Sequence, residues 1–144
     1  MKTRVLFLCI HNSARSQIAE AYLKKYGNNQ FDVESAGLMP GNLNILAVAV
    51  LAEENIDIKY NSTKSVNDFY DQQISFDYVI TVCDPEASES CPVFPGLIRK
   101  INWNFADPSK FEGTSESKLE QTRIVRDQIK KAVLNFVKEY ASPV

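Results

Sequence analysis

Apolar residues along the chain fall into two patterns: short, nearly continuous runs, and longer segments in which they recur every three or four positions. A continuous run is typical of a strand in a parallel sheet covered on both faces, and the longer period is typical of an amphipathic helix. The pattern predicts strands over Val5–Leu8, Phe31–Gly37 and Tyr78–Val82, with a weaker strand over Leu97–Ile101.

The longer period predicts three helices. The first begins at Ser16, and its apolar face is made of Ile18, Tyr22 and Tyr26. The second is marked by Leu43, Leu46, Ala47, Val50 and Leu51. The last is the clearest, with an apolar stripe made of Val125, Ile129, Ala132, Val133, Phe136, Val137 and Tyr140. Ser117–Glu120 has the spelling of a capping box near the start of this helix.

The alternation of strands and helices predicts an α/β fold: one domain over residues 1–144, built as a doubly wound, four-stranded parallel sheet with helices on both faces. Ligands of such sheets bind beyond the carboxyl ends of the strands. Cys9 and Cys83 each follow a predicted strand directly, so this edge of the sheet is the predicted site.

Composition narrows the function classes. The chain is 44% hydrophobic and 24% charged, as globular proteins are, and its net charge of −2 gives no footprint for nucleic acid. It contains no polybasic cluster that would hold it on a membrane. The apolar run after Lys2 and Arg4 ends at His11 and is too short for a secretory signal. We therefore expect a cytoplasmic protein, with the monomer as the default state.

Three cysteines in a reducing compartment are not expected to form structural disulfides. A metal site has little support, because His11 is the only histidine and no C-x-x-C pair exists. We therefore expect no metal or other cofactor. Buried small residues and redox chemistry remain as the two interpretations of the cysteines.

The segment from Cys9 to Ser16 joins the first predicted strand to the first helix and contains Ile10, His11, Asn12, Ser13, Ala14 and Arg15. A loop that leads into a helix N-terminus turns backbone N–H groups inward and can bind a tetrahedral oxyanion. Arg15 can donate two parallel hydrogen bonds to that anion. The same field stabilises a thiolate at Cys9, and Ser16 can donate to its sulfur. These residues predict a nucleophile inside an anion-binding loop.

The C-x5-R-S spelling resembles the low-molecular-weight tyrosine phosphatase superfamily, and His11–Gln17 is similar to the thioredoxin-coupled arsenate reductase branch. The resemblance spans nearly the whole chain, through Glu34–Gly37, Phe76–Cys83, Cys91-Pro92, Asp107-Pro108 and Val125–Asp127. It implies a low-molecular-weight phosphatase-like fold, arsenate as substrate, phosphate or sulfate as mimics of it, and thioredoxin as the electron donor.

The other two cysteines complete a relay. Cys83 ends a predicted strand, and Cys91 follows a polar, proline-containing segment, Asp84–Ser90. As a hypothesis, Cys9 attacks arsenic, a Cys9–Cys83 disulfide forms as arsenite leaves, and Cys91 then attacks Cys83. The resulting Cys83–Cys91 disulfide is reduced by an external dithiol. The resemblance also implies that Asp107, in its Asp-Pro context, is the general acid, for which a raised pKa is needed.

Asn12 is expected to brace the loop through hydrogen bonds. In some arsenate reductases of this branch, residues that match Asn12, Glu20 and Ser35 bind potassium. A further aspartate belongs to that site, but at the corresponding place this sequence reads Ser62-Thr63-Lys64-Ser65, and a cationic Lys64 there competes with a metal ion. His11 is expected to be structural or electrostatic.

Two other functions compete with this one. A tyrosine phosphatase needs Cys9, Arg15 and Asp107 but neither Cys83 nor Cys91, and Ser109-Lys110-Phe111 is a poor clamp for a phosphotyrosine ring. Weak phosphatase activity as a side reaction is compatible with the pattern, since phosphate and arsenate share shape and charge. The second alternative is an oxyanion-binding or thiol-sensing module without catalysis.

Overall fold

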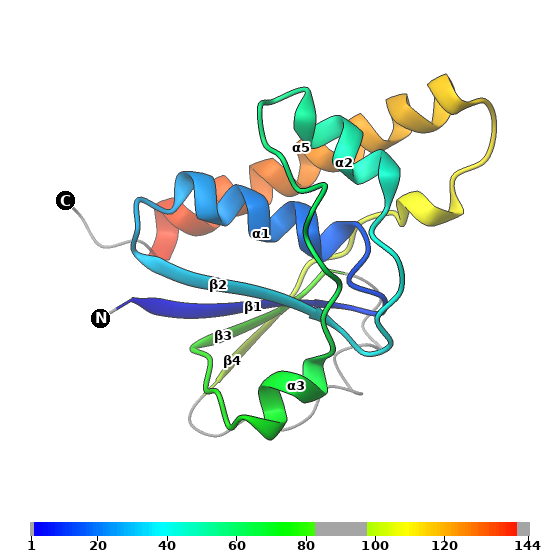
Figure 1. Ribbon diagram of the computed structural model, residues 1–144. Helices are drawn as coiled ribbons and strands as arrows, with labels where there is room; N and C mark the ends of the chain where they lie inside the picture. The colour runs from blue at the N-terminus through cyan, green and yellow to red at the C-terminus, as the bar shows by residue number, and fades with distance from the viewer. Residues whose placement is uncertain (1, 83–97, 141–144) are drawn as a thin grey trace.

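In the computed structural model, which describes residues 2–82 and 98–140, four strands form one parallel sheet (Figure 1). They are β1 (Thr3–Cys9), β2 (Phe31–Gly37), β3 (Tyr78–Thr81) and β4 (Arg99–Asn102), in the order β2-β1-β3-β4. The predicted four-stranded parallel sheet is confirmed. Cys83 and Cys91, the two cysteines predicted to resolve the disulfide, lie outside the described residues.

Helices cover both faces of this sheet, as predicted. Helices α1 (Arg15–Tyr26), α2 (Ile45–Ala52) and α5 (Ser115–Tyr140) lie on one face, and α3 (Val66–Asp71) lies on the other (Figure 1). The side chains of β1 alternate between two buried clusters. Val5, Phe7 and Cys9 belong to the cluster that contains residues of α1 and α5, whereas Leu6 and Leu8 belong to the cluster that contains Val66 of α3. This explains why β1 is apolar at consecutive positions.

Several element boundaries differ from the prediction, and two of them, those of β1 and α2, matter for the site. β1 extends to Cys9, so the candidate nucleophile is the last residue of a buried strand. Helix α2 begins at Ile45, after Leu43, because the Asn44 side chain caps it and accepts hydrogen bonds from the amides of Leu46 (2.7 Å) and Ala47 (3.3 Å). β4 covers Arg99–Asn102, one residue beyond the predicted end at Ile101.

The capping box predicted at Ser117–Glu120 is wrong. Helix α5 already begins at Ser115, and Thr114 caps it by accepting a hydrogen bond of 3.1 Å from the Ser117 amide. Helix α3 was not predicted at all, because six residues are too few for a hydrophobic period. It begins after Ser65, whose hydroxyl accepts a hydrogen bond from the Asn67 amide. Within the described residues, 2–82 and 98–140, no helix is long and apolar enough to cross a membrane.

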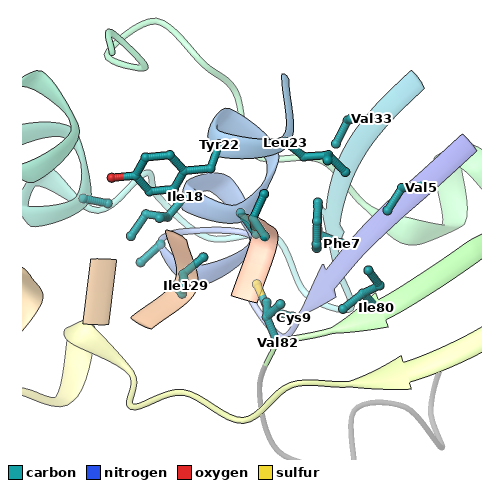
Figure 2. Close-up of a cluster of buried hydrophobic side chains, with 14 of the residues drawn as sticks. Val5, Phe7, Cys9, Ile18, Tyr22, Leu23, Val33, Ile80, Val82 and Ile129 are labelled. Atoms are coloured by element: carbon teal, nitrogen blue, oxygen red, sulfur yellow. The ribbon is translucent and has the colours of Figure 1, made fainter. Parts of the chain in front are cut away.

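The sheet brings three chain segments to one edge. The amide of Val82, just beyond β3, donates to the carbonyl of Leu8 at 3.0 Å, and Figure 2 shows Val82 beside Cys9. After β4 the chain continues along the same edge, where the Trp103 amide donates to the Thr81 carbonyl at 2.7 Å. The carboxyl ends of β1, β3 and β4 therefore meet around Cys9, as the doubly wound topology requires.

Candidate active site

Cys9 is 3% exposed and lies at the end of β1, where the chain enters the loop that leads to α1. Its sulfur accepts a hydrogen bond of 3.0 Å from the Asn12 amide and lies 2.9 Å from the Ser16 hydroxyl oxygen. The Asn12 carboxamide donates to that same hydroxyl oxygen at 2.8 Å, which leaves the Ser16 proton available for the sulfur. Two hydrogen-bonding groups of the loop and of α1 thus face the sulfur.

Asn12 is fully buried and holds the loop in the shape that these contacts need. Its backbone φ is +54°, in the left-handed region that non-glycine residues seldom adopt. Its carboxamide donates to the Ser35 hydroxyl at 2.9 Å and accepts from the Lys64 amide at 2.9 Å. The predicted brace is therefore present, and it ties the loop to β2 and to the segment that precedes α3.

Each loop carbonyl from Cys9 to Ala14 has a donor outside the loop. The backbone donors are the amides of Leu38, Met39, Gly41, Asn44 and Ile18, which bind the carbonyls of Cys9, Ile10, His11, Ser13 and Ala14 respectively at 2.8–3.1 Å. The sixth carbonyl, of Asn12, accepts from the Gln17 side chain at 3.1 Å. The C=O and N–H of a trans peptide point to opposite sides, and no described peptide bond is cis. The loop N–H groups are therefore directed away from these donors. The Asn12 N–H is an example, since it donates to the Cys9 sulfur.

Gly37, the last residue of β2, lies directly against this loop. A Cβ atom at this position would lie 2.7 Å from the Ile10 carbonyl oxygen and 2.8 Å from the Asn12 nitrogen, distances that real side chains do not adopt. The absence of a side chain therefore lets β2 support the loop through its backbone. The sequence pattern indicates only the end of a predicted strand at this glycine.

Arg15 begins α1 and is 8% exposed. One guanidinium nitrogen donates to the Phe105 carbonyl at 3.1 Å, and the other lies 3.4 Å from the Asp107 carboxylate. The guanidinium therefore links the loop to the segment after β4. Arg15 and Asp107 were predicted to act at one site, and the structure brings them together.

Asp107 is held ionised in this arrangement. Burial pushes its pKa upward. The amide and hydroxyl of Ser109, which donate to the carboxylate at 3.0 and 2.8 Å, lower the pKa, and the charges of Arg15 and Lys110 lower it further. The result is a pKa below the usual value of an aspartate. The raised pKa predicted for a general acid is therefore wrong for this structure, because the Ser109 hydrogen bonds, together with the charges of Arg15 and Lys110, outweigh the effect of burial.

Asn12, Glu20 and Ser35, the residues matched to a potassium site, do lie together. The Ser35 hydroxyl accepts from Asn12 and donates to the Glu20 carboxylate. The Lys64 ammonium lies 3.6 Å from Glu20, and the Lys24 ammonium lies 2.5 Å from its other oxygen. Two side-chain cations thus already neutralise this carboxylate. Among residues 2–82 and 98–140, no three His, Cys, Asp or Glu side chains are grouped to hold a metal ion.

His11 belongs to the loop, and its side chain contacts the segment after β2. Its Nδ1 lies 2.9 Å from the Met39 carbonyl oxygen. A carbonyl only accepts hydrogen bonds, so Nδ1 carries the proton in this contact. The structure places His11 as a surface tie between the loop and the segment after β2, in agreement with its expected structural part.

An apolar groove with a volume of about 670 Å³ opens beside the loop. Ser13 of the loop lines it, together with Leu43, Ile45, Pro108 and Phe111. It lies between the segment leading into α2 and the segment that carries Asp107.

Two positions of the site had no predicted role. Gln17 was quoted only as part of the family motif, and its contact with the Asn12 carbonyl depends on a left-handed turn that sequence periodicity does not reveal. The Phe105 carbonyl binds Arg15 through its backbone, so side-chain identity carries no signal for it. For Gln17, the one signal in the sequence is its place two residues after the arginine of the C-x5-R pattern.

Comparison with known proteins agrees with this geometry. Residues 4–142 match the family described as low molecular weight phosphotyrosine protein phosphatase. An arsenate reductase of Halalkalibacterium halodurans is 39% identical over 137 residues, which cover 94% of this chain and 95% of the relative.

Two solved structures extend the comparison. An arsenate reductase in a phosphate-binding state superposes with a TM-score of 0.75 at 29% identity, covering 98% of this chain and all of that one. A thioredoxin-dependent arsenate reductase of Corynebacterium glutamicum gives a TM-score of 0.62 at 28% identity, covering 94% of this chain and 63% of that one. The fold, the C-x5-R-S loop and the match over nearly the full length agree, and the chain belongs to the low molecular weight phosphotyrosine protein phosphatase family.

Proposed function

We propose that this protein reduces arsenate to arsenite and takes part in arsenic detoxification. One observation carries the proposal: the Cys9 sulfur sits between the Asn12 amide and the Ser16 hydroxyl, inside a loop whose carbonyl groups are bound from outside. Such a loop accepts a tetrahedral oxyanion and presents a thiolate to its central atom. The similar arsenate reductases favour arsenate as that oxyanion.

In the first step, the Cys9 thiolate attacks arsenic. A sulfur–arsenic bond forms, an arsenic–oxygen bond breaks, and the departing oxygen takes a proton from Asp107 and leaves as water. Arg15 donates hydrogen bonds to the remaining oxygens and balances their charge. Its guanidinium is already at the loop in the anion-free protein, held by Phe105 and Asp107.

Binding of the anion prepares Asp107 for this role. A dianion at the loop draws the Arg15 charge toward itself and adds negative charge near the carboxylate. Both effects raise the pKa of Asp107, because they disfavour its charged form. Asp107 is thus ionised when the loop is empty and takes up a proton when arsenate arrives.

The two remaining cysteines complete the reduction. Cys83 attacks the Cys9 sulfur, the sulfur–arsenic bond breaks, and its electron pair stays on arsenic, which leaves as arsenite. Cys91 attacks Cys83 in the Cys9–Cys83 disulfide and frees the Cys9 thiolate. Thioredoxin, the donor named for the similar Corynebacterium glutamicum enzyme, then reduces the Cys83–Cys91 disulfide. In the sequence, Cys83 directly follows Val82, whose amide donates a hydrogen bond to the Leu8 carbonyl near the end of β1.

The test is a coupled assay. The protein is mixed with arsenate, thioredoxin, thioredoxin reductase and NADPH, and NADPH oxidation is followed. Arsenate-dependent oxidation is the expected result. Hydrolysis of a phosphotyrosine analogue without arsenate-dependent turnover contradicts the proposal and favours a phosphatase, and neither activity favours a binding module. Mass spectrometry of the arsenate-treated chain is expected to find a disulfide bond between Cys83 and Cys91.

A second activity, slow phosphatase action, is favoured by the groove beside Ser13. Phosphate has the shape and charge of arsenate, and Leu43 and Phe111 line a space for an aryl group. Cys9, Arg15 and Asp107 are the residues that such hydrolysis needs. We expect slow hydrolysis of p-nitrophenyl phosphate that Cys91→Ser leaves unchanged, because the resolving cysteines take no part in it.

A further inference from the structure

Gln17 occupies a special place among the contacts that shape the oxyanion loop. Backbone amides bind five of the six loop carbonyls, and only the Asn12 carbonyl is bound by a side chain, that of Gln17, at 3.1 Å. Gln17 lies in the first turn of α1 and is 1% exposed, so water does not compete for this contact. The Asn12 carbonyl thus depends on the Gln17 side chain for its hydrogen bond, whereas the other five carbonyls are bound by backbone amides.

The Asn12 carbonyl belongs to the peptide that carries the Ser13 N–H. Since the two groups of a trans peptide point in opposite directions, binding the carbonyl to Gln17 aims the Ser13 N–H away from Gln17. The same residue has its φ at +54°, a conformation that an asparagine leaves easily unless neighbouring groups hold it. Turning this peptide would remove one N–H from the anion and disturb the Asn12 amide that contacts the Cys9 sulfur.

Other contacts fix the Gln17 carboxamide itself. Its nitrogen also donates to the Ser62 carbonyl at 3.1 Å, and its oxygen accepts from the Asn61 side chain at 3.1 Å. An amide with partners on both ends cannot flip without losing hydrogen bonds. The orientation of the donor toward Asn12 is thus set by the segment before α3.

We infer that Gln17 is a positioning residue, which keeps the Asn12–Ser13 peptide turned so that the loop N–H groups face the Cys9 thiolate and the bound oxyanion. Gln17 touches neither the sulfur nor the anion and acts through Asn12, whose backbone carbonyl and side-chain oxygen lie 3.1 and 3.2 Å from the Gln17 nitrogen. The inference deepens the proposed oxyanion chemistry and rests on it, but it does not depend on the cysteine relay.

Gln17→Met is the decisive variant, because methionine keeps the length of the side chain and removes its donors. It is made with Cys83 and Cys91 both changed to serine, which leaves Cys9 as the single thiol. Alkylation by iodoacetamide is measured against pH, and protection of Cys9 by inorganic phosphate is measured in the same samples. Gln121→Met is the matched control, since the Gln121 amide also donates to backbone carbonyls, those of Glu112 and Ser117, far from Cys9 in the chain.

Gln17→Met is expected to raise the pH midpoint of alkylation and to weaken phosphate protection about tenfold, the effect of losing one orienting hydrogen bond at a charged site. Gln121→Met is expected to change neither. A Gln17→Met protein that loses thermal stability but keeps both the midpoint and the protection overturns the inference, because Gln17 is then only structural. If the parent protein itself has no phosphate-sensitive alkylation, the proposed function fails instead.

Should Gln17→Met not fold, Asn61→Ala decides the matter. Asn61 is exposed, and its loss removes the donor that orients the Gln17 carboxamide. A smaller shift of the alkylation midpoint in the same direction supports the inference, and an unchanged titration contradicts it.

Discussion

The Arg15 guanidinium lies 3.4 Å from the Asp107 carboxylate, so two groups proposed for opposite tasks neutralise each other while the loop is empty. Arg15 is assigned to bind the oxyanion, and Asp107 is assigned to protonate the oxygen that leaves it. An incoming dianion must compete with the carboxylate for the guanidinium. Anion binding and the protonation of Asp107 are therefore coupled, and both can be measured.

Asp107→Asn tests this coupling. We expect the variant to bind phosphate more tightly than the wild type, because Arg15 has no competing carboxylate, while the first chemical step slows about 10²–10⁴-fold without its acid. Phosphate protection of Cys9 and single-turnover release of arsenite measure the two effects. Asp57→Asn is the control: Asp57 also accepts from an amide two residues later and pairs with a nearby lysine. Weaker phosphate binding by Asp107→Asn would contradict the coupling.

The lowered pKa of Asp107 also predicts how acid affects stability. A carboxylate whose pKa is lower in the folded than in the unfolded protein stabilises the fold above its unfolded pKa, and this contribution is lost as the pH falls through the folded pKa. Asp107→Asn should therefore lower the unfolding temperature at pH 6 more than at pH 3. The difference at pH 6 should be about 1 kcal/mol or less, as for other partly solvated ion pairs. An equal effect at both pH values would rule out this linkage.

Asn12→Ala should be among the most destabilising changes in the loop. It removes the acceptor of the Lys64 amide and the donor to Ser35, both at a buried position, at a cost of about 2–4 kcal/mol in unfolding free energy. Asn29→Ala separates this from the backbone effect, because Asn29 also has a positive φ of 59° but is exposed. Its expected cost is about 1 kcal/mol or less. Urea unfolding measures both variants, and equal costs would mean that the side-chain contacts contribute nothing.

We expect Lys64 to make potassium unnecessary at Glu20. The Lys64 and Lys24 ammonium groups already neutralise this carboxylate, so turnover should be the same in potassium chloride and in tetramethylammonium chloride at equal ionic strength. Lys64→Met removes one of these charges, and its turnover should then increase with potassium. Lys59→Met, which breaks an exposed ion pair with Asp57, should not respond. Potassium-stimulated turnover in the wild type would disprove this account.

The relay predicts different defects for the two resolving cysteines. Cys91→Ser should release one equivalent of arsenite per protein and then stop, because the Cys9–Cys83 disulfide cannot be passed on. Cys83→Ser should retain arsenic on Cys9 and release none. Quantifying arsenite against protein distinguishes these outcomes. Steady-state turnover by Cys91→Ser at the wild-type rate would exclude the relay as written.

The fold was predictable because its signal is spread over many residues. The continuous apolar run of β1 and the stripe of α5 each involve several positions, and a parallel sheet with covered faces is the arrangement that buries them all. Short elements carried too little signal: α3 has six residues, and the start of α5 depends on one hydroxyl at Thr114. Boundaries were therefore less certain than the elements themselves.

The site was predictable in its residue types but not in its electrostatics. The spacing from Cys9 to Arg15 indicates an anion-binding loop, because the chemistry requires those two residues at that distance. The pKa of Asp107 depends on hydrogen bonds from Ser109 and on the charge of Arg15, a residue 92 positions away, and neither contact can be read from the residue types alone. The Gln17 contact depends on a left-handed residue within the loop. The roles of Cys83 and Cys91 stay predictions.

The contact between Gly37 and the loop has a consequence for protein design. The loop's eight residues take their shape against the backbone of β2, whose last residue leaves no room for even one methyl group beside Ile10 and Asn12. Transplanting Cys9–Ser16 onto another strand–helix junction would therefore fail to recreate the anion cradle. A host protein must also supply a neighbouring parallel strand that ends in glycine and the segment after it, whose amides bind four of the loop carbonyls. The smallest transferable unit is therefore a pair of strands with their connecting helix and the following segment as far as Asn44.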